Sequence, residues 1–216
     1  TYDLGGVAEA LDGLRLTLGY RYTWDKVDGF TTSYVATPFP SAAVFVPDGN
    51  NFTCLSSGAR VVTSDQCSFT SSQKESRPTW TAGLDYKLSP DLLLYGKVSR
   101  GYKAGGFNTN AVRAETRTFG PESVTAYELG FKSDFTIADT PVRLNADIFR
   151  TDYDKIQRAA GDTNLATGAA GAQIISVAAA RIDGVEVEMV VKPIPPLELG
   201  LTYSHLDAKY TKYNFP

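Results

Sequence analysis

The stretch PTWTAGLDYKLSPDLLLYGKVSRGYKAGGF, residues 78–107, decides the fold class. In its first half, apolar residues at every second position from Trp80 to Leu88 alternate with Thr, Gly, Asp and Lys, which is the period of a strand with one apolar and one polar face. Ser89-Pro90-Asp91 is a turn, and a second, less regular alternation begins at Leu92. These residues predict an antiparallel hairpin with a tight turn at one end and a Gly-rich, open other end.

The same unit recurs along the chain. Its clearest copy runs from Leu14 to Trp24, where Leu, Leu, Leu, Tyr, Tyr and Trp occupy every second position. A strand that crosses a bilayer has a physical reason to collect its aromatic side chains at one end, because these side chains suit the lipid-water interface. Further strands with this alternation are expected at residues 125–135, 142–156, 185–192 and 197–204.

The connections alternate in length. Short turns are expected at 89–91, 137–141 and 193–196, and long loops at 27–77, 103–122 and 158–179. This order places every short turn at one end of the sheet and every long loop at the other, as outer-membrane barrels do. We therefore predict an all-β fold, an antiparallel up-and-down transmembrane β-barrel, here a partial barrel of about seven strands with short periplasmic turns and long extracellular loops. The alternative is a soluble β-sandwich or binding module that packs the Leu14–Trp24 face against protein.

Composition and charge argue against several classes of function. With 216 residues, a net charge of −3 and a pI near 5.2, the chain offers no basic surface for nucleic acid. Residues 163–180 are free of charge but too rich in Gly and polar residues for a transmembrane helix. Cys54 and Cys67 predict a local disulfide in an oxidising compartment, with two free thiols as the alternative. No Cys/His ligand pattern accompanies them, so no metal site is expected.

Three groups of residues have types that could serve catalysis or bind a cofactor. Glu186 and Glu188 are explained as charges facing a hydrated channel. Ser204 and His205 point to opposite faces of a strand and cannot act as nucleophile and base. The glycines of Gly101–Gly106 lack the strand-to-helix context of a phosphate loop. We therefore expect neither an enzyme nor a cofactor.

Several segments resemble TonB-dependent outer-membrane receptors. They are the residues 18–25 (LGYRYTWD), 94–108 (LYGKVSRGYKAGGFN), 121–133 (PESVTAYELGFKS) and 182–188 (IDGVEVE). The resemblance implies a barrel of about 22 strands with an N-terminal plug. It also implies import of ferric siderophores, cobalamin or carbohydrates, with energy from an inner-membrane complex.

Taken with the strand pattern, the resemblance yields a set of expectations. Residues 1–216 would be an internal part of one such β-barrel domain, with the plug domain and the remaining strands absent, and its two unpaired edges would make it unstable alone. The location would be the cell outer membrane of a Gram-negative bacterium. The partners would be outer-membrane lipid, the TonB complex through the missing N-terminal part, and a ferric siderophore or other scarce nutrient. The alternative is a small self-contained outer-membrane barrel acting as an adhesin or hydrolase.

Ligand contacts are expected where the strands pass into the long loops. One group of candidates comprises Arg100, Tyr102, Lys103 and Asn108, and a second comprises Arg158, Asp162 and Asn164. Cationic and aromatic groups at this position suit an anionic, aromatic ferric chelate. Ordinary solvation of a barrel rim is the alternative explanation for each of them.

Overall fold

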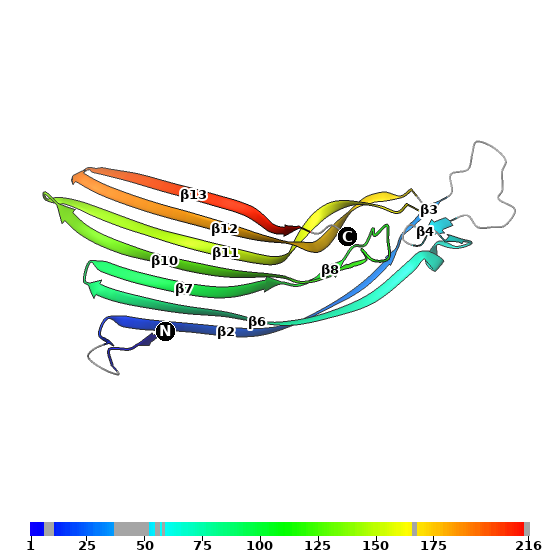
Figure 1. Cartoon of the computed structure of the whole chain (residues 1–216), viewed down its shortest axis with the longest axis horizontal. Coiled ribbons are helices and arrows are strands. Elements are labelled where there is room, and N and C mark those ends of the chain that lie inside the picture. Colours follow the sequence, from blue (N-terminus) through cyan, green and yellow to red (C-terminus); the bar gives the residue numbers. More distant parts are fainter. Residues whose placement is uncertain (7–10, 37–51, 55–56, 58, 166–167, 214–216) are drawn as a thin grey trace.

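The fold is an elongated antiparallel sheet (Figure 1). The computed structural model describes residues 1–6, 11–36, 52–54, 57, 59–165 and 168–213. The main sheet has eight strands in chain order, β1-β2-β6-β7-β10-β11-β12-β13. Their bounds are Tyr2–Asp3 (β1), Leu14–Thr32 (β2), Ser68–Ser89 (β6), Leu92–Lys103 (β7), Glu122–Ile137 (β10), Thr140–Thr163 (β11), Ala170–Ile194 (β12) and Leu197–Tyr213 (β13). The seven long strands confirm the predicted count, and in the described residues β1 and β13 do not pair to close the sheet.

Tight turns join the long strands at one end. Pro90-Asp91, Ala138-Asp139 and Pro195-Pro196 each lie between two paired strands. Ala138 and Asp139 have φ of 45° and 64°. Positive φ at both central residues defines a type I′ turn, whose twist matches that of the flanking strands. Pro193 was predicted to lie in the last turn, but β12 continues through it, with a register shift between Val191 and Ile194 that accommodates the missing N–H.

One face of the sheet carries an apolar band. Residues paired across an antiparallel sheet share a face, and one such row is Leu16, Leu84, Gly96, Leu129, Ile148, Val185 and His205. These side chains meet no second protein layer: Leu129 is 60% exposed and Ile148 55%. The intervening residues on the opposite face are polar, for example Lys97 beside Glu128. An open apolar face of this size requires a nonaqueous partner.

The apolar band crosses the sheet obliquely. On β2 it runs from Leu14 to Trp24, and on β13 it runs from Leu197 to Tyr203 before Asp207. Strand pairing puts Leu14 level with Tyr203, so the band begins on β2 where it ends on β13. This offset is what tilted strands produce, and its length on β2 matches the roughly 9–11 residues that a tilted strand needs to cross a bilayer.

Two of the three predicted long loops are wrong in extent. β2 continues to Thr32 and β6 begins at Ser68, so the connection predicted at 27–77 is 33–67. β11 and β12 pair as far as Thr163 with Ala170, so the loop predicted at 158–179 is reduced to 164–169. Beyond the band both faces of a strand meet water, and the alternation that reveals a strand disappears although main-chain pairing continues. The 103–122 loop is confirmed, because β7 ends at Lys103 and β10 begins at Glu122.

Short strands and a 3-10 helix lie within the long loops. The connection after β2 contains β3 (Tyr34–Ala36), β4 (Phe52–Cys54), β5 (Arg60–Val61) and a 3-10 helix, η2 (Ser64–Cys67), and Cys54 is disulfide-bonded to Cys67. The loop after β7 contains β8 (Gly106–Phe107) and β9 (Thr118–Phe119). Within the described residues, the structure has no helix long and apolar enough to cross a membrane.

The buried side chains gather at the loop end of the sheet. Most of them belong to residues 104–121, which we call the clasp, or to the ends of β11 and β12 that it contacts. They are Asn108, Ala111, Val112, Thr116, Ile156, Asp162, Asn164, Gln173, Ile175 and Ala178. In Figure 1 the clasp, labelled at β8, lies between the arm made by β2 and β6 and the β11–β12 hairpin. The well-packed part of the chain is therefore its loop end, while the band stays open.

Candidate functional site

A pocket of about 460 Å³ lies where the polar face of the sheet meets the clasp. Its lining combines cationic groups with aromatic, acidic and apolar ones: Lys103, Glu122, Tyr153, Ile156, Gln157, Arg158, Ala180, Ile182, Ala208, Lys209 and Tyr210. Its size falls in the range of small-molecule sites. Lys103 and Arg158 against Glu122 give the pocket a positive character. Lys209, by contrast, pairs with Arg181 on the other face, and its ammonium lies 3.3 Å from Asp207 Oδ2.

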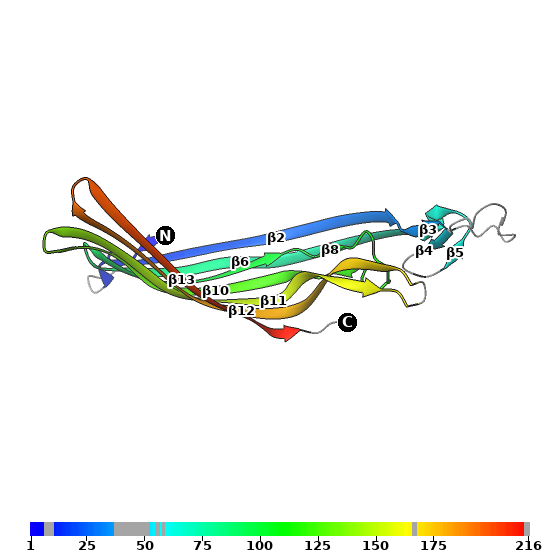
Figure 2. The ribbon, with the colours of Figure 1, turned by 90° about the horizontal axis from the view of Figure 1, so that it is seen from above.

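Two compensating β-bulges shape this pocket. Tyr153 pairs with Ala180 and Ile156 with Ala178, so β11 carries an extra residue between them, and β12 then carries one before Ser176. Lys155 takes a φ of 55°, a left-handed conformation that is uncommon for a residue with a side chain. Bulges bend a strand pair and redirect its side chains. Figures 1 and 2 show the yellow and gold part of the β11–β12 hairpin bending at this end of the sheet, and the pocket occupies the elbow.

Gln157, just after the bulge, fixes the base of the clasp. Its main-chain N–H donates to Oε2 of Glu122 at 2.8 Å. Its side-chain Nε2 donates to the carbonyls of Ala104, at 2.8 Å, and Gly120, at 3.1 Å. These carbonyls stand at the two ends of the clasp, so one amide group holds both. The pocket and the clasp therefore share a wall.

The structure divides the predicted ligand residues into three sets. Lys103, at the end of β7, and Arg158, in β11, line the same pocket. Arg100 pairs with Trp80 and Thr125 and so shares a face with the apolar band, away from this pocket. The hydroxyl of Tyr102 donates to the carboxylate of Asp25, which ties β7 to β2. Whether any of them contacts a ligand stays a prediction.

Asn108, Asp162 and Asn164 form the third set, and their side chains hold the clasp. Asn164 Nδ2 donates to the carbonyl of Val112 at 2.7 Å. Asp162 accepts a hydrogen bond from Thr116 Oγ1 at 2.9 Å, and its Oδ1 lies 2.7 Å from Arg113 Nε. Burial raises the pKa of Asp162, but the bonds from Arg113 and Thr116 outweigh it and hold the pKa below the ordinary value. All three residues are less than a tenth exposed.

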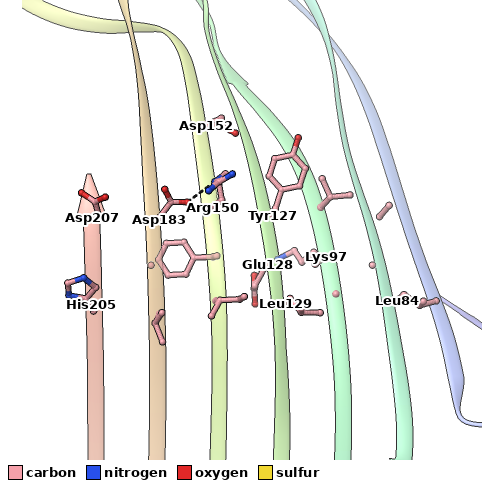
Figure 3. Close-up of a pocket in the computed structure, with 18 of the residues that line it drawn as sticks. Leu84, Lys97, Tyr127, Glu128, Leu129, Arg150, Asp152, Asp183, His205 and Asp207 are labelled. Atoms are coloured by element: carbon pink, nitrogen blue, oxygen red, sulfur yellow. Dashed lines mark hydrogen bonds and ion pairs between the residues drawn. The ribbon is translucent and has the colours of Figure 1, made fainter. Parts of the chain in front are cut away.

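A larger hollow, of about 1230 Å³, lies mainly on the apolar band (Figure 3). Leu84, Leu129 and Val185 are among its lining residues, and Arg150 pairs with Asp183 at 2.7 Å at one edge. Its charged residues Arg150, Asp152, Asp183 and Asp207 gather at this edge, and most of its other lining residues are apolar or glycine. A hollow of this kind on an open apolar face suits hydrocarbon chains better than a specific solute. We therefore take the smaller, cationic pocket as the candidate site.

Of the residues that line this pocket, sequence reasoning identified Lys103 and Arg158 and missed the others, among them Glu122, Gln157 and Tyr153. Glu122 was placed at the end of a loop, and Gln157 carried no motif. The bulge at Lys155 that aims Gln157 toward the clasp has no clear sequence signal, because Lys is not a residue that favours positive φ.

The sheet's tilted strands, its apolar outer band and its polar inner face define the wall of a transmembrane β-barrel. Residues 4–216 match the family described as TonB dependent receptor-like, beta-barrel. The chain belongs to this family of receptors and transporters.

Curated and solved relatives agree with this assignment. The chain is 25% identical over 158 residues to a probable TonB-dependent siderophore receptor, PiuA, of Acinetobacter baumannii, covering 70% of this chain and 20% of that protein. The ferric yersiniabactin uptake receptor FyuA of Yersinia pestis superposes with a TM-score of 0.61 at 19% identity, over 92% of this chain and 24% of that one. The solved PiuA of A. baumannii superposes with a TM-score of 0.56 at 19% identity, over 93% and 24%. The solved structures support the fold alone, and this chain spans about a fifth to a quarter of these relatives.

Proposed function

We propose that this chain is part of the barrel wall of a receptor in the outer membrane of a Gram-negative bacterium, one that imports a scarce nutrient with energy from the TonB complex. The observation that carries the proposal is the oblique apolar band, whose length suits a bilayer and whose opposite face is polar. Membership in the TonB-dependent receptor family supports a role of the whole protein in transport. The chain itself is the wall, and the rest of the receptor would complete the barrel.

The nutrient we propose is an anionic ferric siderophore. Lys103 and Arg158 offer positive charge in one pocket, and Tyr153 and Tyr210 offer aromatic surface beside it. Guanidinium and ammonium groups bind carboxylate or catecholate oxygens through charge-assisted hydrogen bonds. Two relatives carry names that agree: PiuA is named a probable siderophore receptor and FyuA a ferric yersiniabactin uptake receptor.

The test is uptake by the full-length receptor in its own host. Deleting the gene should slow growth under iron limitation, and radioactive iron supplied as individual ferric siderophores should enter only cells that carry it. Binding without uptake is expected in a strain that lacks TonB. Unchanged iron uptake across hydroxamate, catecholate and carboxylate siderophores would refute the siderophore proposal.

Within the receptor, the variant K103A/R158A should lose affinity for that siderophore. Arg100→Ala is the matched control, because Arg100 is a cation at the end of the same strand on the other face. Each charge-assisted contact contributes about 1.5–3 kcal/mol, so the double variant should bind at least tenfold more weakly. An equal loss of siderophore affinity in Arg100→Ala would refute the assignment of this pocket as the binding site.

A further inference from the structure

In the described residues, β13 covers only part of the edge of β12. β13 pairs with β12 only as far as Ala178 with Tyr213, while β12 continues to Ala170. Among the described residues, no strand of the main sheet pairs with this part of β12 on the side away from β11. An unpaired edge displays N–H and C=O groups that attract another strand or must be covered.

Asn108 covers this edge. Its Oδ1 accepts from the N–H of Ile174 and its Nδ2 donates to the carbonyl of the same residue, both at 2.8 Å. A neighbouring antiparallel residue makes this same pair of bonds, so one carboxamide takes the place of a strand. Nδ2 also donates to the carbonyl of Thr116 at 2.7 Å, which fixes the side chain within the clasp. Asn108 is 9% exposed.

The other side of the clasp is anchored to the β2–β6 arm. The hydroxyls of Thr31 and Ser33 donate to the carbonyl of Thr109 at 2.9 and 2.8 Å. The ring of Phe107 lies against Gly29, where a Cβ would stand 2.7 Å from it. At the loop end of the sheet β7 and β10 are shorter than the strands on either side of them. The clasp spans the gap that they leave between the β2–β6 arm and the β11–β12 hairpin (Figure 1).

We propose that Asn108 is a positioning residue for the cationic pocket. By bonding to Ile174 it fixes the β11–β12 hairpin in its bent position, and this bend keeps Arg158 in the pocket with Lys103. The pocket is then already formed before a ligand arrives. Asn108 itself contacts no ligand in this account, and only the role of the pocket in siderophore binding rests on the proposed function.

The first test measures the hairpin, in the full-length receptor in lipid nanodiscs. Asn108→Ala should raise amide exchange at Ile174 by about tenfold or more, since the N–H loses its acceptor. Asn108→Asp should raise this exchange less, because a carboxylate still accepts from the N–H of Ile174 but cannot donate to the carbonyls of Ile174 and Thr116. The control is Asn110→Ala: its side chain is exposed, and only its carbonyl accepts, from Gln173 Nε2 at 2.9 Å. Unchanged exchange at Ile174 in both Asn108 variants would overturn the proposal.

The second test measures the pocket without any siderophore. Ala180→Cys places a thiol in the pocket lining. Thiol reagents of equal size but opposite charge should react at different rates, with the anionic reagent the faster. Asn108→Ala should bring the ratio of the two rates toward one, and Asn110→Ala should leave it unchanged. A ratio that survives Asn108→Ala would refute the positioning role even if the hairpin loosens. If Asn108→Ala brings the ratio of the two rates to one but the receptor imports no siderophore, the proposed function is refuted and the positioning role of Asn108 stands.

Discussion

The main-chain N–H of Gln157 donates to the carboxylate of Glu122 at 2.8 Å, while its side chain binds both ends of the clasp. This contact joins three parts of the chain: the start of β10, the bulge in β11 and the base of the loop between β7 and β10. A wall of the candidate pocket therefore depends on one uncharged side chain. Its neighbour Arg158 is exposed and lines the same pocket.

These neighbours give a matched pair of variants. Gln157→Ala should free the carbonyl of Ala104 and leave the carbonyl of Gly120 with Ser176 Oγ, at 2.7 Å, as its donor. It should raise amide exchange in the clasp, for example at Asn108, whose N–H donates to the carbonyl of Arg117 at 2.9 Å. Loss of a buried hydrogen bond typically costs about 1–3 kcal/mol, which is a tenfold or larger change in exchange. Arg158→Ala should leave exchange in the clasp unchanged. If both variants loosen the clasp equally, Gln157 does not have the role assigned to it.

The apolar band predicts opposite effects of the same substitution at adjacent positions. Leu144 shares the apolar face with Met189, and Asn145 lies on the polar face opposite Glu188 and Lys132. Leu144→Lys should lower the free energy of unfolding from a bilayer by about 2–4 kcal/mol, as a cation near the midplane does. Asn145→Lys should change it by less than about 1 kcal/mol. Denaturant titration of the full-length receptor in vesicles would measure both, and equal costs would argue that neither face meets lipid.

The disulfide should stabilise its loop and leave the sheet alone. Cys54 and Cys67 are 13 residues apart, and closing a loop of this size stabilises it by roughly 3 kcal/mol. Cys54→Ser with Cys67→Ser should therefore raise amide exchange in η2, while exchange in the β10–β11 hairpin stays the same. A comparable rise in both places would show that the loop supports the barrel wall.

Asp162 should make the clasp sensitive to acid. Its pKa is held below the ordinary value in the folded state, so its contribution to stability is fully present above the unfolded pKa and is lost as pH falls through the folded pKa. Exchange at Arg117, whose N–H donates to the carbonyl of Ala114, should rise below about pH 4. Asp162→Asn should raise exchange at neutral pH and flatten this pH dependence. An unchanged acid response in the variant would assign it to another group.

The sequence predicted the sheet where its two faces meet different solvents. Residues 14–24 alternate cleanly because one face meets hydrocarbon and the other water, whereas residues 25–32 continue the same strand with no alternation because both faces meet water. Lys103 and Arg158 were identified from charge and place in the chain. Their convergence could not be read from sequence, because it depends on the bulge at Lys155. A ligand contact of Asn108 stays a prediction, and no sequence signal showed that its side chain bonds to an edge of the sheet.

The most direct test of the account places spin labels, one at a time, at positions 127–135 of β10 in the full-length receptor in lipid bilayers. Oxygen concentrates in hydrocarbon and a nickel chelate concentrates in water, so their collision rates with each label report which solvent it meets. The account predicts that labels at Tyr127, Leu129, Phe131 and the odd positions beyond favour oxygen, and that labels at the even positions between them favour nickel. Collision rates that are low for both reagents at the odd positions would show a second protein layer over this face and contradict the barrel wall.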